Sequence, residues 1–222
     1  ELIAQTAQIA GAKTQVRQGL GNTAIVYEAL RSGQIDVYAE YTGTIAQELV
    51  QDPAAGHSLS ALNAALRAKG LALTASVPLG FNDGYALAMK REHAQALQIS
   101  KLSDLARHPA LKFGLSNEFL GRADGWRSLA QAYGLPHSPR GLDPGLAYEA
   151  LAQGQIEVMD IYTTDAKIEH LGLLVLQDDR QHFPRYDAVL LHRADLPQRQ
   201  PAAWQALQTL AGRISEADMI AM

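Results

Sequence analysis

Amphipathic stretches and short apolar stretches alternate along the whole chain. Apolar residues at helical spacing predict helices in the ranges 1–12, 23–31, 44–52, 58–70, 122–135, 165–172 and 200–215, with shorter helical segments between them. Compact apolar runs bounded by Gly, Pro, Asp and Asn predict strands in the ranges 71–79, 85–90, 111–116, 173–176 and 187–192, and a further strand is expected at 13–18. This alternation predicts an α/β fold with largely parallel sheets.

Two stretches of the chain are nearly the same. Residues 27–44 read YEALRSGQIDVYAEYTGT and residues 148–165 read YEALAQGQIEVMDIYTTD, with ten identities in eighteen aligned positions at an offset of 121. A period of that length is far too long for a solenoid and suits two related lobes. The alternative is that both copies are a common α/β supersecondary unit.

Each copy of the repeat predicts a helix end, a turn and a strand. Gly33 and Gly154 stand where glycine ends a helix in the left-handed conformation. Strands at 35–38 and 156–159 then lead to Tyr41 and Tyr162. We therefore expect these two tyrosines at equivalent strand ends.

Composition narrows the classes of function. The 222 residues are 47% hydrophobic and 19% charged with a net charge of −4 and no dense Lys/Arg run, which argues against nucleic-acid binding. There are no cysteines, so disulfides, zinc–thiolate sites and thiol nucleophiles are excluded. No apolar run approaches the eighteen residues of a membrane span. The chain opens inside a predicted helix, so a leader or a first strand is expected before it.

Motifs for catalysis, metals and nucleotides are missing from the sequence. There is neither G-x-S-x-G nor H-E-x-x-H, and the seven histidines lack metal-ligand spacing. The segment Gly-Leu-Gly-Asn-Thr ahead of residues 23–31 lacks the P-loop pattern, and its Asn22 or Thr23 is a candidate N-cap. The sequence predicts a protein that is not an enzyme and has no metal or cofactor.

Tyrosine is over-used among the aromatic residues, with eight tyrosines against four phenylalanines and two tryptophans. A buried phenol needs a hydrogen-bond partner, so tyrosines in polar turns indicate a site. Four stand in such turns, and an electron-rich box of them would attract a quaternary ammonium cation: Tyr41, Tyr85, Tyr162 and Tyr186. The remaining four are assigned to packing: Tyr27, Tyr38, Tyr133 and Tyr148.

Arg122 is the other candidate site residue. It stands in the glycine-flanked turn EFLGRADGW, where a guanidinium can hold a carboxylate through two hydrogen bonds. The alternative reading is a surface arginine that pairs with Asp124.

The motifs GLGNTAIVYEALRSGQIDVYAEYTGT, FNDGYALAM, EFLGRADGW, DIYTTDAKI and DDRQHFPRYDAVLL occur in that order and together span nearly the whole chain. The chain resembles the substrate-binding proteins of osmoprotectant ABC importers, which bind glycine betaine, proline betaine, choline or carnitine. The resemblance implies a two-lobed type II periplasmic-binding-protein fold with the ligand in the cleft between the lobes. It implies a first lobe of residues 1–86 and 188–222 and a second lobe of residues 87–187.

The resemblance also implies roles for individual residues. Tyr41, Tyr85, Tyr162 and Tyr186 match the family's aromatic box for the trimethylammonium group, with Tyr85 on the first lobe or hinge. Arg122 matches the residue that holds the ligand's carboxylate, and Thr44 matches a hydroxyl that assists it. Asp83 lies beside the box and adds a negative charge near the cation. Family members carry a further strand before the first helix and a further helix after a segment like ISEADMIAM, so both are expected to be missing from this chain.

The function implied is that of the solute receptor of an ABC importer for a quaternary ammonium compound. Its partner would be the transporter permease, and its place periplasmic or otherwise extracytoplasmic, whether free, lipid-anchored or fused to the permease. The sequence does not rank glycine betaine, proline betaine, carnitine, choline and ergothioneine. The alternative is a ligand-sensing effector domain of a transcription regulator, which shares this fold and would need a helix-turn-helix region.

Overall fold

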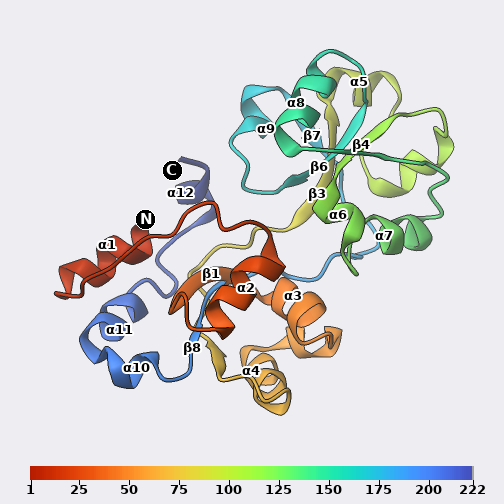
Figure 1. Ribbon diagram of the computed structural model, residues 1–222. Coiled ribbons are helices and arrows are strands. Elements are labelled where there is room, and N and C mark those ends of the chain that lie inside the picture. The colour runs from red at the N-terminus through yellow and green to blue at the C-terminus, as the bar shows by residue number, and fades with distance from the viewer. Residues whose placement is uncertain (222) are drawn as a thin grey trace. The chain divides into compact units, whose positions relative to one another are not determined.

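The computed structural model describes residues 1–221, and the chain divides into two compact units. Unit 1 comprises residues 1–82 and 185–220, and unit 2 comprises residues 83–184 together with Ala221 (Figure 1). The chain thus changes unit at 82–83 and at 184–185, and the resemblance implied changes at 86–87 and 187–188. Tyr85 therefore falls in unit 2 and Tyr186 in unit 1.

Unit 1 is built on a three-stranded sheet in the order β1-β8-β2. Its strands are β1 (Val37–Tyr41), β8 (Ala188–Arg193) and β2 (Leu73–Ala75), and both pairings are antiparallel. In β8, Ala188 and Leu190 contribute to one hydrophobic core cluster, and Val189 and Leu191 contribute to another. Successive strand residues point to opposite faces, so the continuous apolar run of β8 is explained by a sheet covered on both sides.

Helices cover both faces of this sheet. One core cluster draws on α2 and α4, and the other on α1 and α11. The helical elements of unit 1 are α1 (Leu2–Ile9), α2 (Thr23–Arg31), α3 (Thr42–Thr44), the π-helical η1 (Ile45–Leu49), the 3-10 turn η2 (Pro53–His57), α4 (Leu59–Ala68), α10 (Leu196–Arg199), α11 (Pro201–Gln208) and α12 (Glu216–Ala221).

Unit 2 is built on a five-stranded mixed sheet in the order β5-β4-β6-β3-β7. The strands are β3 (Tyr85–Lys90), β4 (Phe113–Ser116), β5 (Arg140–Leu142), β6 (Val158–Tyr162) and β7 (Leu173–Val175). Helix α8 packs on β4 and β6 (Figure 1). The helical elements of unit 2 are α5 (Arg91–Ala96), the 3-10 turn η3 (Leu102–Arg107), α6 (Asn117–Gly121), α7 (Trp126–Tyr133), α8 (Pro144–Ala152) and α9 (Lys167–His170).

The prediction of largely parallel sheets is wrong. Among the strand pairings within residues 1–221, those of β4 with β5 and β6 are parallel, and the other four are antiparallel. Strands β3 and β8 are the first strands after each change of unit, and each runs antiparallel to both of its neighbours. A helix–strand alternation does not reveal where a chain leaves one sheet and enters another.

The strand predicted at 13–18 is also wrong. This segment forms no strand, and Val16 is 49% exposed. The β-branched residues Thr14 and Val16 have strand propensity, but burial against a partner decides whether the strand forms.

The two copies of the repeat fold alike. The amides of Gln34 and Ile35 donate to the carbonyl of Ala29, and the amides of Gln155 and Ile156 donate to the carbonyl of Ala150 in the other copy. Gly33 and Gly154 adopt left-handed φ angles of 79° and 70°. Each strand starts two residues later than expected and ends at the expected tyrosine: Tyr41 ends β1 and Tyr162 ends β6. The prediction of equivalent strand ends is confirmed.

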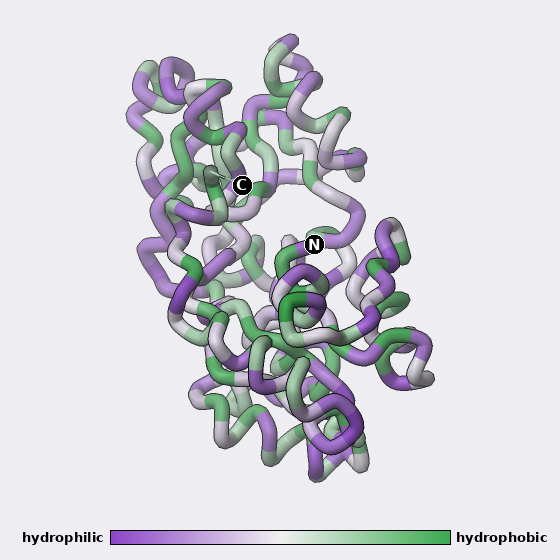
Figure 2. The backbone as a smooth tube through the Cα atoms, turned by 90° about the vertical axis from the view of Figure 1, so that its left-hand side faces the viewer, coloured by the Kyte–Doolittle hydropathy of each residue, from purple (hydrophilic) through white to green (hydrophobic). Residues whose placement is uncertain are grey.

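Within residues 1–221, no helix combines the length and the apolar character needed to cross a membrane. Figure 2 shows short hydrophobic stretches alternating with hydrophilic ones along the tube.

Candidate functional site

Tyr85 and Tyr162 form a pair in unit 2. Strand β3 begins at Tyr85 where the antiparallel strand β6 ends at Tyr162, and the two residues are register partners. Their ring centroids lie 5.0 Å apart at an interplanar angle of 46°, and their hydroxyl oxygens are 3.2 Å apart. Tyr85 is 6% exposed, whereas Tyr162 is 42% exposed. The pair therefore has a buried member and a member that presents its ring at the surface.

Both phenols are held in the neutral form. Burial raises the pKa of Tyr85, and the neighbouring Tyr162 hydroxyl adds to that shift. Burial also raises the pKa of Tyr162, against a smaller opposing effect of its hydrogen bond with Tyr85. The pair thus offers electron-rich ring faces without a phenolate charge.

Phe119 and Arg122 complete the surroundings of Tyr85. The ring of Phe119 stacks on Tyr85 with centroids 5.2 Å apart at 30°, and the ring of Phe183 lies 6.1 Å from that of Phe119. The guanidinium carbon of Arg122 is 4.9 Å from the centroid of Tyr85. Phe119 and Phe183 did not emerge from the sequence as site residues. Each stands within three residues of a predicted site residue, which was the signal available.

Arg122 is buried and paired with Asp124. Each residue is 6% exposed, and the arginine Nε and Nη2 donate to the two carboxylate oxygens at 2.8 and 2.9 Å. The Nη1 atom also lies 3.8 Å from the carboxylate of Glu118. Of the two readings left open by the sequence, the pairing with Asp124 is present, but the arginine is not a surface residue. Its burial against Tyr85 places it in the aromatic cluster.

A pocket of 240 Å³ lies beside Tyr162 within unit 2. Four carboxylates and two tyrosines contribute to its wall, and none of the described lining residues is Lys, Arg or His. Burial raises the pKa of Asp160, opposed by the hydrogen bonds from Ser116. The lining residues are Ser116, Asn117, Glu118, Leu142, Asp143, Pro144, Tyr148, Asp160, Ile161, Tyr162 and Asp165. This wall is suited to a cation and unsuited to an anion.

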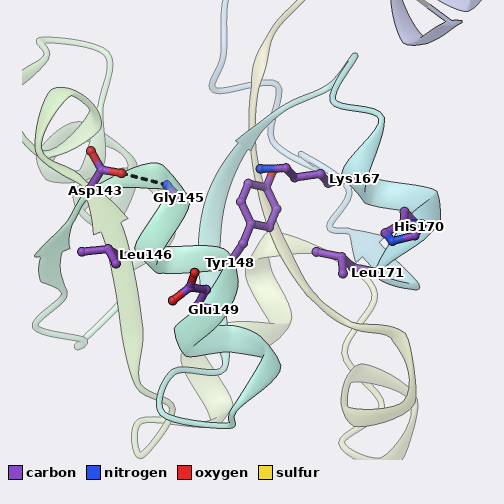
Figure 3. Close-up of a pocket in the computed structure, with 8 residues that line it drawn as sticks. All are labelled: Asp143, Gly145, Leu146, Tyr148, Glu149, Lys167, His170 and Leu171. Carbon is purple, nitrogen blue, oxygen red and sulfur yellow. Dashed lines mark hydrogen bonds between the residues drawn. The ribbon is translucent and has the colours of Figure 1, made fainter.

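Tyr148 belongs to this wall as well as to the core. It packs in the core cluster of α8 and β6, as the sequence predicted, but its hydroxyl also donates to Asp165. The ring additionally lines a second pocket of 450 Å³, where the Nζ of Lys167 lies 4.3 Å from its centroid (Figure 3). Lys167 is directed over the tyrosine ring in that view. Sequence context gave no signal for this second role, because Tyr148 stands in the middle of a helix.

Asp83 connects the start of β3 with the turn after β6. Its Oδ1 accepts from the amide of Thr164 at 3.2 Å, and the amide of Gly84 donates to Thr163 Oγ1 at 3.0 Å. These bonds hold the chain beside both members of the tyrosine pair.

The other three candidate residues lie in unit 1. Tyr41 ends β1, and its ring meets that of Phe81 edge-on at 6.5 Å. Thr44 is in α3 and is 3% exposed. Tyr186 is 1% exposed and lies against Gly43, where an added Cβ would be 2.6 Å from the tyrosine Cδ1.

The structure thus groups the seven candidates by unit. Asp83, Tyr85, Arg122 and Tyr162 lie in unit 2, and Tyr41, Thr44 and Tyr186 lie in unit 1. Among residues 1–221, no group of three or more His, Asp or Glu side chains is arranged to hold a metal ion.

Comparison with known sequences decides the family. The sequence model of OpuAC, the substrate-binding domain of ABC-type glycine betaine transport systems, matches residues 1–222. The chain belongs to the OpuAC family. It is therefore a substrate-binding component of an ABC-type transport system and not an enzyme, as the sequence predicted.

Two relatives align with nearly all of this OpuAC domain. A glycine-betaine-binding protein of Pseudomonas aeruginosa is 34% identical over 238 residues, covering 100% of this chain and 75% of that protein. An ergothioneine transport permease/ergothioneine binding protein of Helicobacter pylori is 33% identical over 201 residues, covering 90% of this chain and 36% of that protein.

Solved structures show the same fold. A structure described as a glycine betaine/carnitine/choline ABC transporter superposes with a TM-score of 0.75 at 26% identity, covering 99% of this chain and 85% of that one. The two-lobed type II periplasmic-binding-protein fold expected from the resemblance is confirmed. The comparisons give no support to the alternative of a transcription regulator's effector domain.

Proposed function

We propose that this OpuAC domain captures a quaternary ammonium solute, of the glycine betaine or choline type, for an ABC importer. The observation that carries the proposal is the Tyr85–Tyr162 pair, whose exposed member borders a pocket walled by carboxylates. The named relatives, which bind glycine betaine and ergothioneine, support the same ligand class.

The chemistry of the pair suits a cation that donates no hydrogen bonds. Each electron-rich ring contributes about 0.5–2 kcal/mol to binding a cation once water is excluded. A trimethylammonium group leaves no donor unpaired when its water is removed, so it loses little on entering an aromatic site. The carboxylates Glu118 and Asp160 add a favourable potential around Tyr162.

A carboxylate on the ligand would be held by Arg122. The guanidinium lies against the ring of Tyr85 and is oriented by two hydrogen bonds to Asp124, and the ligand's carboxylate would share it with that aspartate. Burial beside Tyr85 favours a strong charge-assisted bond to the ligand. The proposal therefore leans towards carboxylated betaines.

The proposal assigns the remaining candidates to the same ligand. Tyr41 and Tyr186 supply further aromatic contacts, Thr44 assists with the carboxylate, and Asp83 adds negative charge near the cation. A ligand favours one arrangement of a protein over another only by its differential affinity. In this proposal, the transporter permease recognises the ligand-bound arrangement on the extracytoplasmic side of the membrane.

A thermal-shift panel tests the proposed ligand class. Glycine betaine, proline betaine, carnitine, choline and ergothioneine are each added to the purified chain, with glycine as the control that lacks methyl groups on nitrogen. A ligand at 100 times its dissociation constant stabilises the folded state by about 2.7 kcal/mol, so at least one compound is expected to raise the Tm by several degrees. If no compound shifts the Tm more than glycine does, the proposed function is wrong.

A further inference from the structure

Asp160 lies two residues before Tyr162 on β6 and has no role in the function proposed so far beyond its charge. Residues i and i+2 of a strand point to the same face of the sheet, so Asp160 and Tyr162 share a face. Its carboxylate accepts two hydrogen bonds from Ser116, the last residue of β4: one from the backbone amide and one from the hydroxyl, both at 2.6 Å. The side chain is thus tied to the end of the neighbouring strand.

Ser116 also forms a hydrogen bond with helix α6. Its hydroxyl oxygen accepts from the amide of Phe119 at 3.0 Å, which makes Ser116 the N-cap of α6. An N-cap serine satisfies an amide that has no partner within its helix and so fixes where the helix begins. The hydroxyl hydrogen is given to Asp160, which leaves the oxygen's lone pairs for the helix.

Helix α6 carries the groups that surround Tyr85. Phe119 stacks on the tyrosine ring, and Arg122 is the C-cap residue of the helix, with its amide bonded to the carbonyl of Glu118 at 3.1 Å. A chain of short contacts therefore runs from Asp160 through Ser116 to Phe119 and Arg122. Only five residues separate the N-cap from Arg122, so a shift at the cap reaches the cluster directly.

A carboxylate is the side chain that fits this position. It presents two acceptor oxygens and no donor, which matches the two donors of Ser116. An asparagine would present one acceptor and an NH₂ group. Its NH₂ group would face one of the two Ser116 donors. The Ser116 hydroxyl would then have to rotate and accept a hydrogen bond from this NH₂ group, in competition with the bond that it accepts from the Phe119 amide.

We propose that Asp160 is a positioning residue for the ligand site, acting through Ser116 to fix α6 and thereby the places of Phe119 and Arg122 against Tyr85. This inference rests on the proposed function, since it concerns the affinity for the quaternary ammonium ligand. It assigns to Asp160 an effect on affinity that requires no contact with the ligand.

Unit 2 contains a matched control. Asp104 accepts from the amide of Ser100 at 3.0 Å and from its hydroxyl at 3.5 Å, and it is 7% exposed. This aspartate–serine pair stabilises the start of η3 and lines neither of the pockets described above. Asp104→Asn makes the same substitution in the same unit, and it additionally removes the ion pair of Asp104 with Arg107 at 2.8 Å.

The test measures glycine betaine affinity by calorimetry and the Tm of each variant. Asp160→Asn and Ser116→Ala are expected to bind about tenfold more weakly than the parent. Ser116→Thr, which keeps the hydroxyl, is expected to bind within about threefold of it. Asp104→Asn is expected to lower the Tm and leave affinity unchanged. If Asp160→Asn does not fold, the affinities of Ser116→Ala and Ser116→Thr test the positioning role instead.

Asp160→Asn is also measured in a Phe119→Ala variant, because this combination distinguishes a positioning role of Asp160 from direct contact with the ligand. Residues that act through one another show non-additive effects, so Asp160→Asn should cost little further affinity once Phe119 is truncated. The same tenfold loss in both backgrounds would overturn the inference, as would equal affinities of Asp160→Asn and Asp104→Asn in a parent that binds glycine betaine. A parent that binds none of the panel compounds contradicts the proposed function itself, and the positioning role is then rejected with it.

Discussion

Tyr162→Ala is expected to weaken glycine betaine binding at least tenfold. Tyr162 is the exposed member of the tyrosine pair and borders the acidic pocket, so its ring is the face most open to a cation. Loss of a ring worth about 0.5–2 kcal/mol, together with its apolar contact, is close to the 1.4 kcal/mol that corresponds to a factor of ten. Calorimetric titration of the folded variant measures the change.

Two control variants distinguish the contribution of the Tyr162 ring from that of its hydroxyl and from a general loss of stability. Tyr162→Phe keeps the ring and loses only the contact with the Tyr85 hydroxyl at 3.2 Å, so a loss of a few-fold at most is expected. Tyr27→Ala removes a half-buried tyrosine of α2 that packs against a core cluster of unit 1, and it should leave affinity unchanged while lowering stability. Parent-like affinity of Tyr162→Ala would show that the tyrosine pair does not hold the ligand.

Arg122→Met is expected to reduce both stability and ligand discrimination. Removal of the guanidinium takes away two hydrogen bonds and the charge partner that Arg122 supplies to the buried carboxylate of Asp124. Breaking a buried pair in this way costs about 3–5 kcal/mol of unfolding free energy. Affinity for glycine betaine should fall by a larger factor than affinity for choline, because only the former carries a carboxylate.

The double variant Arg122→Met/Asp124→Asn isolates the effect on ligand discrimination from the effect on stability. It removes the carboxylate charge that the single variant leaves buried, so denaturant unfolding should show much of the lost stability restored. The preference between glycine betaine and choline should remain reduced. Equal losses of affinity for the two compounds would exclude a carboxylate role for Arg122.

The parts of the fold that depend on local rules could be predicted from the sequence. Asn22 caps α2 through the amide of Ile25, and Gly33 and Gly154 take up the same left-handed turn. These features need only a few neighbouring residues, so sequence spacing determines them. Strand directions were predicted wrongly because they depend on where the chain changes unit, which no local pattern records.

The site could be predicted only in part. Sequence context singled out Tyr85 and Tyr162, and the register of β3 and β6 brings them together. The pairing of Arg122 with Asp124 in a buried setting, and the part played by Tyr148 in a pocket wall, depend on tertiary packing. Phe119 was passed over because phenylalanine is ordinarily a core residue.

The central claim is that the site recognises a positive charge surrounded by methyl groups. Calorimetric titration of the parent with glycine betaine and with 3,3-dimethylbutanoate tests it most directly, because the second compound replaces the nitrogen by carbon at nearly constant shape. We expect glycine betaine to bind at least about tenfold more tightly, since two or more aromatic contacts of about 0.5–2 kcal/mol each are lost with the charge. Equal affinities for the two compounds would contradict the claim.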